Sequence, residues 1–402
     1  MEWTDQQARA IDRACDWWNN DRFKQQVHRI FGYAGAGKTE LAKEIARRIG
    51  RTQFGAYTGK AASVLRQRGC DNASTIHSLI YTPVVPGLTA LRQLEQQFLD
   101  AKAKPDTHPD LLERLRRAIE EERESTNRMA FLLNPLSDVA NANLMIIDEC
   151  SMIDSKVGED LLSFGTPVLV LGDPAQLPPV RGQGFFTQRE PDTMLTEIHR
   201  QARDNPIIQM ATTVRQGGRL DLGEYGSSRV VMRSKIQPED AMAASQILCG
   251  KNATRRAINL RCRSLLNRPR GEPVAGDRLV CLANDHDVGL LNGTLWELLN
   301  AARATDKTYD FVIRSLDDEA RELGCEAVDH FILGRDGELN WWEASGLQQF
   351  DYGYALTCHK AQGSQWPNVM VFDESWVFKA DRNRWLYTAL TRAQEAVTVV
   401  RD

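Results

Sequence analysis

The sequence predicts an α/β fold with parallel sheets, divided over more than one domain. The first 80 residues alternate helical and strand-like segments, which favours parallel strands covered by helices. Apolar runs at 144–147 and 168–171 end in Asp or Gly, as expected where a buried strand ends. At about 150 residues per domain, a chain of 402 residues accommodates between two and three domains.

The composition excludes several classes of protein. Apolar residues make up 42% and charged residues 26% of the chain, which is typical of globular proteins and not of disordered or collagen-like ones. The 50 basic and 54 acidic residues give a net charge of −4, so a uniformly basic coat is excluded while a local basic groove is not. The 8 cysteines include no C-x-x-C pair and indicate reduced thiols. No apolar run is long enough to span a membrane, and the N-terminus lacks a signal-peptide pattern.

The N-terminal elements follow in a regular order. Thr4 as N-cap and Gln7 three residues later predict a helix start with a capping box. Residues 27–31 read as a buried strand, residues 38–49 as a helix after a glycine loop, and residues 52–58 as a second strand.

Residues 88–126 interrupt this order. Apolar stripes at helical spacing within 91–98 and 112–119 predict two charged helices joined by a turn that contains Pro105 and Pro109. The flanking segments 79–81 and 131–133 are expected to pair as strands at the base of this insertion.

A second α/β unit begins near residue 197. Between about 277 and 350 the chain turns β-rich, with turn signals at Gly276-Asp277, Asn292-Gly293 and Asp336-Gly337. Residues 351–402 return to α/β order.

Residues 32–39 (Gly-Tyr-Ala-Gly-Ala-Gly-Lys-Thr) match the phosphate-binding loop G-x-x-x-x-G-K-[ST]. Backbone N–H groups and the N-terminus of the following helix would surround phosphate oxygens, Lys38 would reach the β- and γ-phosphates, and the Thr39 hydroxyl would coordinate Mg²⁺. A glycine-rich turn with an exposed lysine is the alternative. The predicted nucleotide contacts from this segment are Gly35, Ala36, Gly37, Lys38, Thr39 and Glu40.

Asp148 and Glu149 follow the strand at 144–147. A phosphate loop needs a second metal ligand and a residue that activates water, and these two carboxylates are suited to both tasks. Asp148 would hold Mg²⁺ together with Thr39, and Glu149 would orient or deprotonate the attacking water. A surface acidic pair that caps the next helix is the alternative.

Four further segments, together with the phosphate loop, resemble the ordered motif set of superfamily 1 helicases. They are Asp-Glu-Cys-Ser-Met at 148–152, Leu-Gly-Asp-Pro-Ala-Gln-Leu-Pro-Pro-Val at 171–180, residues 354–364 around Thr-Cys-His-Lys-Ala-Gln-Gly-Ser, and Tyr-Thr-Ala-Leu-Thr-Arg-Ala at 387–393. The resemblance is to the 5′→3′ branch, with RecD-like enzymes and the bacteriophage Dda helicase, and it extends from Gln7 to Arg392.

The resemblance implies two RecA-like domains with ATP bound between them. The first would comprise residues 1–79 and 141–196, with a helical insertion at 80–140 in the place of the wedge that splits duplex. The second would comprise residues 197–280 and 351–402, with an SH3-like insertion at 281–350. Family wedges are usually β-hairpins, so the helical character here leaves the strand-separating residue unassigned.

The resemblance also assigns roles to single residues. Gln7 would contact adenine, although it also fits the capping box, and Gln176 would sense the γ-phosphate. Arg200 and Arg392 would be arginine fingers from the second domain, since a guanidinium suits charge developing on a phosphoryl group; a solvated helix arginine is the alternative for each. Nucleic-acid contacts would come from Thr58, Lys60, His77, Asn252, Arg255, Thr357, His359, Lys360 and Gln362.

Two assignments stay open at this point. For His77, a satisfied core histidine is the alternative to a nucleic-acid contact. Trp341, Trp342 and Tyr352 could stack on bases, but tryptophans paired in a β-rich insert are more often core.

These features together predict an ATP-dependent DNA helicase that needs ATP and Mg²⁺, moves 5′→3′ on single-stranded DNA and unwinds duplex. We expect a monomer in the cytoplasm of a bacterial or phage-infected cell, acting at single/double-strand junctions, with replication or repair proteins as further partners. An RNA helicase of the same branch and a nucleotide-switched nucleic-acid clamp are the alternatives. A kinase or GTPase built on the same loop would not need the later motifs.

Overall fold

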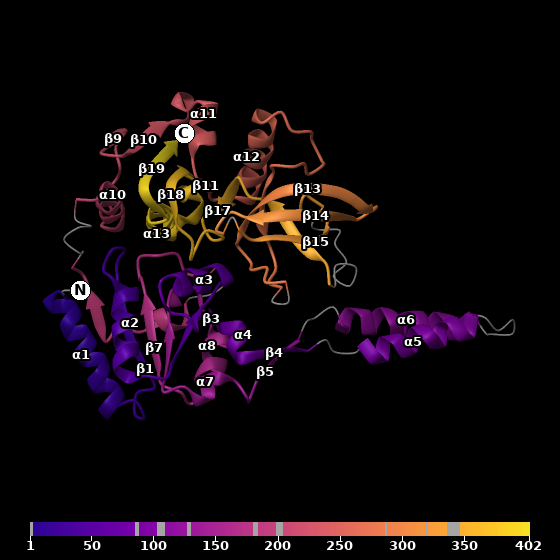
Figure 1. The fold of residues 1–402 in the computed structure, drawn as a ribbon, viewed down its shortest axis with the longest axis horizontal. Helices are drawn as coiled ribbons and strands as arrows, with labels where there is room; N and C mark the ends of the chain where they lie inside the picture. The colour runs from indigo at the N-terminus through magenta and orange to yellow at the C-terminus, as the bar shows by residue number, and fades with distance from the viewer. Residues whose placement is uncertain are drawn as a thin grey trace.

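The computed structural model describes the whole chain except residues 1–2, 85–87, 103–108, 127–129, 180–183, 198–203, 286–287, 319 and 336–345. The described part forms two α/β lobes, a barrel beside the second lobe and a pair of long helices that projects from the first (Figure 1). No helix among the described residues is long and apolar enough to cross a membrane.

The first lobe is built on a six-stranded sheet in which every neighbouring pair is parallel. Its order is β3 (Ser74–Thr75), β2 (Thr52–Ala56), β6 (Leu144–Ile147), β7 (Val168–Gly172), β1 (Val27–Gly32) and β8 (Thr193–Leu195). The parallel sheet that the sequence predicts is thus confirmed.

Alternation along the strands of this sheet creates two cores. Leu144 and Ile146 face one side, and Met145 and Ile147 face the other. The first side packs on α1 (Asp5–Asn20), α2 (Lys38–Ile49) and α3 (Gly59–Gln67). The second packs on α4 (Ile76–Ile80), α7 (Asp138–Asn141), α8 (Ser155–Leu162) and the short helices η1 (Cys150–Met152) and η2 (Phe185–Gln188).

The second lobe has a sheet of the same size. Its order is β17 (Ala355–Thr357), β11 (Gln246–Cys249), β18 (Trp366–Phe372), β19 (Ala393–Arg401), β10 (Ser228–Met232) and β9 (Gly223–Tyr225), with only β9 antiparallel to its neighbour. One face packs on α10 (Pro206–Arg215) and α13 (Arg382–Leu390). The remaining helices of this lobe are η3 (Arg233–Lys235), α11 (Pro238–Ala243), α12 (Asn252–Leu265) and η5 (Ser375–Asp381).

A closed five-stranded barrel is inserted between α12 and β17. It consists of β12 (Arg278–Cys281), β13 (Leu295–Thr305), β14 (Thr308–Ser315), β15 (Glu322–Val328) and β16 (Gln348–Tyr352). Its core is continuous with the second face of the neighbouring sheet, where Ile247 and Met370 join Phe311 and Phe350 of the barrel. The barrel begins and ends a few residues outside the predicted insertion of 281–350.

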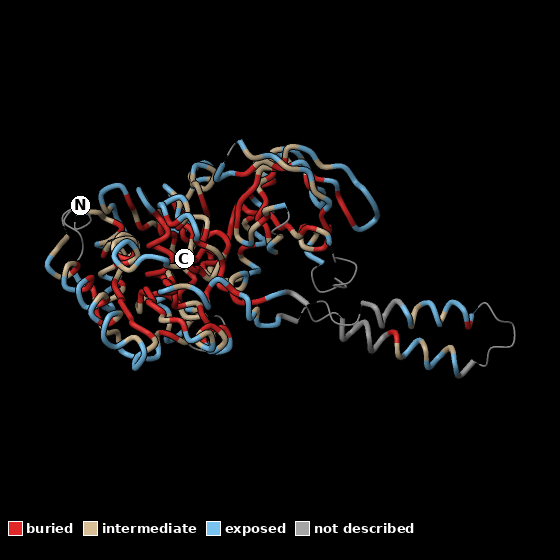
Figure 2. The backbone as a smooth tube through the Cα atoms, turned by 60° about the horizontal axis from the view of Figure 1, so that its bottom comes forward, coloured by how far each residue is buried: buried red, intermediate tan, exposed pale blue. Residues whose placement is uncertain are grey.

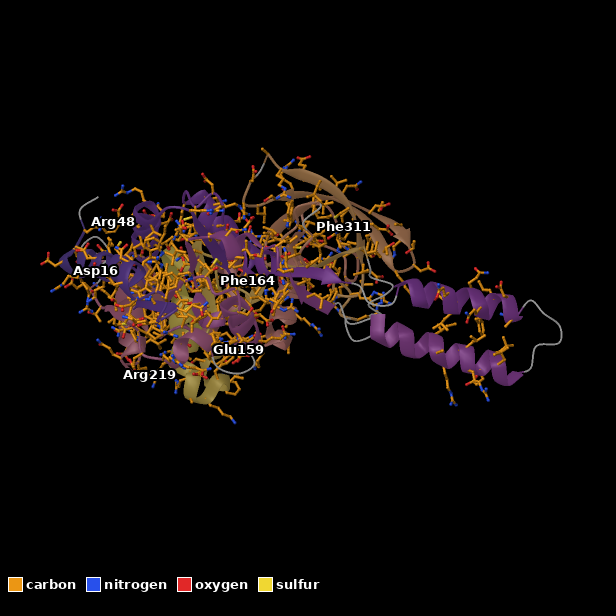
Figure 3. All side chains as sticks on the ribbon, turned by 90° about the horizontal axis from the view of Figure 1, so that it is seen from below. Asp16, Arg48, Glu159, Phe164, Arg219 and Phe311 are labelled. Carbon is orange, nitrogen blue, oxygen red and sulfur yellow. The ribbon has the colours of Figure 1, made fainter. Side chains whose placement is uncertain are left out.

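The insertion in the first lobe is a helical hairpin. The strands β4 (Tyr81–Val84) and β5 (Ala130–Leu133) pair antiparallel at its base, and α5 (Leu88–Lys102) lies against α6 (Pro109–Thr126). Most of its described side chains are exposed or only partly buried, whereas burial concentrates in the two sheets and the barrel (Figure 2). The described side chains of the two helices stand apart from the crowded side chains of the lobes (Figure 3). Leu79 and Ile80, predicted as strand, end α4 instead, and Pro105 lies outside the described residues.

Candidate functional site

The phosphate loop occupies the turn between β1 and α2, at the carboxyl end of the parallel strands. Gly37 is the N-cap of α2 and has φ +75°, a left-handed conformation that disfavours any side chain. A Cβ atom there would also lie 2.8 Å from Nε2 of Gln7. Backbone shape and packing therefore both require glycine at this position.

Lys38 and Thr39 begin α2 and both point into the loop. The Lys38 ammonium donates to the carbonyl of Gly32 at 2.6 Å and to that of Tyr33 at 3.2 Å. The Thr39 hydroxyl donates to Oδ2 of Asp148 at 3.0 Å. The two side chains predicted to hold Mg²⁺ are thus already in contact.

Asp148 and Glu149 follow β6, next to β7, at the same edge of the sheet. Removal from water and the nearby Glu149 carboxylate raise the pKa of Asp148. Glu149 has φ +54°, a strained conformation for a residue with a side chain, and its N–H donates to Oδ1 of Asp148 at 2.9 Å. A carboxylate held this way beside a threonine hydroxyl is suited to Mg²⁺, because the cation prefers oxygen ligands and would offset the crowded negative charge.

Gln176 and Arg392 approach the loop from opposite sides of the cleft. Gln176 is 7% exposed, and its buried Oε1 has no hydrogen-bond partner among the described residues, which leaves it able to accept from a ligand or water. Arg392 follows α13 in the second lobe, is 3% exposed and donates to the carbonyls of Thr388 at 3.1 Å and Ser364 at 3.3 Å. Arg200, the other predicted finger, lies outside the described residues.

These side chains line one cavity of about 620 Å³ between the lobes. The phosphate loop, Asp148, Glu149 and Gln176 come from the first lobe, and Gly363, Gln365 and Arg392 come from the second. A charged, polar cavity with an unpaired amide oxygen fits a nucleotide triphosphate better than an apolar ligand.

Gln7 is held by the protein itself. Its Oε1 accepts from the Thr4 N–H at 3.1 Å, which completes the predicted capping box, and its Nε2 donates to the Ala36 carbonyl at 3.1 Å. The capping interpretation is confirmed, and the adenine contact stays a prediction. Glu40 lines the cavity and forms an ion pair with Lys43 at 2.7 Å.

Hydrogen bonds join the lobes at the floor of the cleft, and the sequence analysis missed them. The Tyr387 hydroxyl accepts from the Ala34 N–H at 2.9 Å and donates to Oδ2 of Asp173 at 2.7 Å. The N–H of Leu177 donates to the Thr388 hydroxyl at 2.9 Å. Tyr387 and Thr388 belong to the motif at 387–393 that carries Arg392. Their place in that motif was the signal in the sequence that could have indicated these contacts.

Three predicted nucleic-acid contacts lie on the first lobe. Thr58 caps α3 through the N–H of Ala61. Lys60 is 9% exposed, and its Nζ lies 2.5 Å from Oδ1 of Asp317, in the turn after β14. The ring of His77 lies 5.9 Å from that of Tyr57 and 5.6 Å from that of Tyr81, and burial lowers the pKa of His77.

The contacts predicted on the second lobe divide into exposed and buried residues. Asn252 and Lys360 are exposed, and His359 is partly exposed. Thr357, Gln362 and Arg255 are buried.

Two of the buried residues have partners inside the protein. Gln362 donates to the carbonyl of Leu177 at 3.0 Å, and Arg255 forms an ion pair with Asp351 at 2.5 Å. The Arg255 guanidinium and the Gln362 amide nitrogen are thus engaged inside the protein, while Oε1 of Gln362 has no partner among the described residues. The contact of these two side chains with a strand stays a prediction. Tyr352 is also buried, whereas Trp341 and Trp342 lie outside the described residues.

The chain matches two protein families. Residues 2–233 match the family described as AAA domain, and residues 352–400 match the UvrD-like helicase C-terminal domain. The ATP-dependent RecD2 DNA helicase of Deinococcus radiodurans is 32% identical over 282 residues, which is 63% of this chain and 35% of that protein. The chain spans about a third of the length of the curated relatives that it matches, at 35% and 30%.

The fold is similar to solved helicase structures. A Pif1 helicase from Candida albicans gives a TM-score of 0.53 at 17% identity over 100% of this chain and 94% of that one. A Pif1 helicase from Bacteroides, in complex with ADP-AlF3 and ssDNA, gives 0.53 at 17% identity over 99% and 92%. At these identities the likeness shows the fold alone.

Proposed function

Since this chain belongs to the AAA domain family, among the RecD-like and Pif1-like helicases of superfamily 1, we propose that it couples ATP hydrolysis to the unwinding of DNA. One observation carries the proposal. Arg392 of the second lobe lines the same cavity as Lys38 and Glu149 of the first lobe, so the cavity is complete only when the two lobes meet.

Each side chain has a role in the proposed hydrolysis. Lys38 leaves the carbonyls of its own loop to bind β- and γ-phosphate oxygens. Thr39 and Asp148 would hold Mg²⁺, which would supply positive charge to offset the negative charge of the phosphates. Glu149 orients or deprotonates the attacking water. Arg392 stabilises charge that develops on the γ-phosphoryl group. Gln176 can accept a hydrogen bond from the attacking water through its free Oε1 and donate one to a γ-phosphate oxygen through Nε2.

Movement along a strand follows from closing and opening of the cleft. ATP biases the two lobes only by binding the closed arrangement more tightly than the open one. We propose that residues 1–79 with 141–196 and residues 197–280 with 351–402 grip single-stranded DNA in alternation, and that the polarity is 5′→3′. The hairpin at 80–140 is the proposed wedge and the barrel, which we regard as SH3-like, the proposed cover of the strand.

The exposed residues Asn252 and Lys360, together with His359 and Thr58, are the proposed strand contacts. Single-stranded DNA and single/double-strand junctions are the proposed partners of a monomer, in the cytoplasm of a bacterial or phage-infected cell. The Bacteroides relative, whose complex contains ADP-AlF3 and ssDNA, supports both ligands.

The proposal is tested by ATP hydrolysis with and without single-stranded DNA, followed by unwinding of duplexes with a 5′ or a 3′ tail. We expect stimulation by DNA, unwinding only from the 5′ tail, and neither activity in Lys38→Ala. Stronger stimulation by a matched RNA strand would identify an RNA helicase instead. Binding without multiple turnover would identify a nucleotide-switched clamp, which the presence of both Glu149 and Arg392 in the lining of the cavity disfavours.

A further inference from the structure

Trp376 is a large aromatic side chain that the protein leaves in water. It lies in η5, just after β18, and is 63% exposed. Burying an indole is strongly favourable, so a ring left this open is suited to a partner that covers it.

The ring is held in place from one side. The Lys251 ammonium lies 5.1 Å from the ring centroid of Trp376, and the same nitrogen lies 2.9 Å from Oε1 of Glu374. A cation over the face of an indole is attracted to it, and here the carboxylate fixes the cation. One face of Trp376 is therefore occupied, while its large exposed area leaves surface for a ligand.

Glu374 also shapes the backbone beside the ring. It is 8% exposed, and its Oε2 accepts from the N–H groups of Gly250 at 2.8 Å and Lys251 at 2.9 Å. Its Oε1 accepts from the hydroxyl of Thr254 at 2.7 Å. This carboxylate binds the end of β11 and the start of α12 to the segment that carries Trp376. These hydrogen bonds fix the backbone beside the ring and therefore the position of the ring.

The location points to a nucleic-acid strand as the ligand. The strands β11, β17 and β18 are parallel, and they end at Cys249, Thr357 and Phe372, which places the residues after them at one edge of the sheet. The ring of Phe378, two residues after Trp376, lies 5.6 Å from that of His359 and would meet a Cβ of Gly250 at 3.1 Å. Trp376 thus shares its edge with the exposed Asn252 and with His359.

We propose that Trp376 is a stacking platform for one base of single-stranded DNA, prepared by Lys251 and Glu374. Every base has a π-face, so this contact grips a strand without reading its sequence, as a motor requires. A ring that is already fixed loses little conformational freedom on binding, which favours affinity. The inference rests on the proposed function, because it requires a strand on this edge.

The test compares the binding of two fluorescein-labelled probes of equal length. One is oligo(dT), and the other has the same backbone but lacks the bases at the positions that would contact the second lobe. Wild type should prefer oligo(dT), and Trp376→Ala should weaken its binding about ten-fold. The variant should bind the abasic strand as well as wild type does, because no base is left to stack. Trp376→Phe keeps a ring and should retain most of the affinity.

Phe23→Ala is the matched control. Phe23 is also an exposed aromatic ring with a guanidinium over it, that of Arg22 at 4.5 Å, but it precedes β1 at the opposite edge of the first sheet. Its truncation should leave both affinities unchanged. Equal oligo(dT) binding by wild type and Trp376→Ala, or an equal loss on both probes, would overturn the stacking assignment. Failure of wild type to bind either probe would instead refute the proposed function.

Discussion

The hydroxyl of Tyr387, in the second lobe, accepts a hydrogen bond from the N–H of Ala34, in the phosphate loop of the first, at 2.9 Å. The same hydroxyl donates to Asp173 at 2.7 Å, and burial together with that carboxylate raises the pKa of Tyr387. The phenol therefore stays protonated and can serve both partners. A single side chain thus ties the position of the second lobe to the shape of the nucleotide loop.

We predict that Tyr387→Phe lowers DNA-stimulated ATP turnover about ten-fold and changes ATP affinity much less. The substitution keeps the ring but removes the partner of the partly buried Ala34 N–H and of Oδ2 of the buried Asp173, at a cost of about 1–3 kcal/mol each. Steady-state hydrolysis and nucleotide titration measure the two effects. Tyr225→Phe is the control, since that hydroxyl bonds only Asp221 within its own lobe. Equal turnover in both variants would contradict the coupling role.

We predict that Asp317→Ala tightens binding of single-stranded DNA several-fold at low salt. Lys60 is paired with Asp317 at 2.5 Å, so removing the carboxylate frees the ammonium for a phosphate. Added salt should abolish the gain, because contacts to phosphates are screened and exchange counterions.

The control for this effect is Asp318→Ala, which removes the same charge one residue later. That variant should gain much less affinity. If the two variants bind alike at every salt concentration, Lys60 is not a strand contact.

We predict that Glu374→Gln destabilises the protein at neutral pH and that the difference from wild type shrinks in acid. Burial alone would raise the pKa of Glu374, but donation by Thr254, Lys251 and Gly250 outweighs it and lowers the pKa below its ordinary value. A carboxyl with a lower pKa in the folded state contributes stability above its unfolded pKa and loses it as pH falls through the folded value.

Urea unfolding of both proteins from about pH 7 to about pH 3 measures this difference. Glu326→Gln, an exposed position on β15, is the control and should show no such trend. A difference that stays constant with pH would contradict the role given to the carboxylate.

Local features of the fold were predictable from the sequence, because their partners lie within one turn. The capping box of Thr4 and Gln7 and the helix 38–49 follow from spacing alone, and both are found. The phosphate loop could also be recognised from the sequence. Its left-handed backbone at position 37 requires glycine, so the motif is visible in the residue types themselves.

Side-chain contacts that depend on how the two lobes and the barrel pack together were not predictable. Arg255 and Gln362 match strand-contact motifs, yet they turn inward to Asp351 and Leu177 because the orientation of a side chain depends on what packs beside it. The pairing of Lys60 with Asp317 arises only because the barrel closes and approaches the first lobe. The sequence pattern of each segment taken alone does not indicate that these side chains come into contact.

The central claim is that both lobes complete one ATP site, and turnover by Arg392→Ala tests it most directly. ATP affinity should be retained, while DNA-stimulated turnover should fall about a thousand-fold or more, the effect typical of an arginine finger. Arg384→Ala, at an exposed position on α13, the helix that precedes Arg392, should be unaffected. A turnover number for Arg392→Ala equal to that of wild type would contradict the claim.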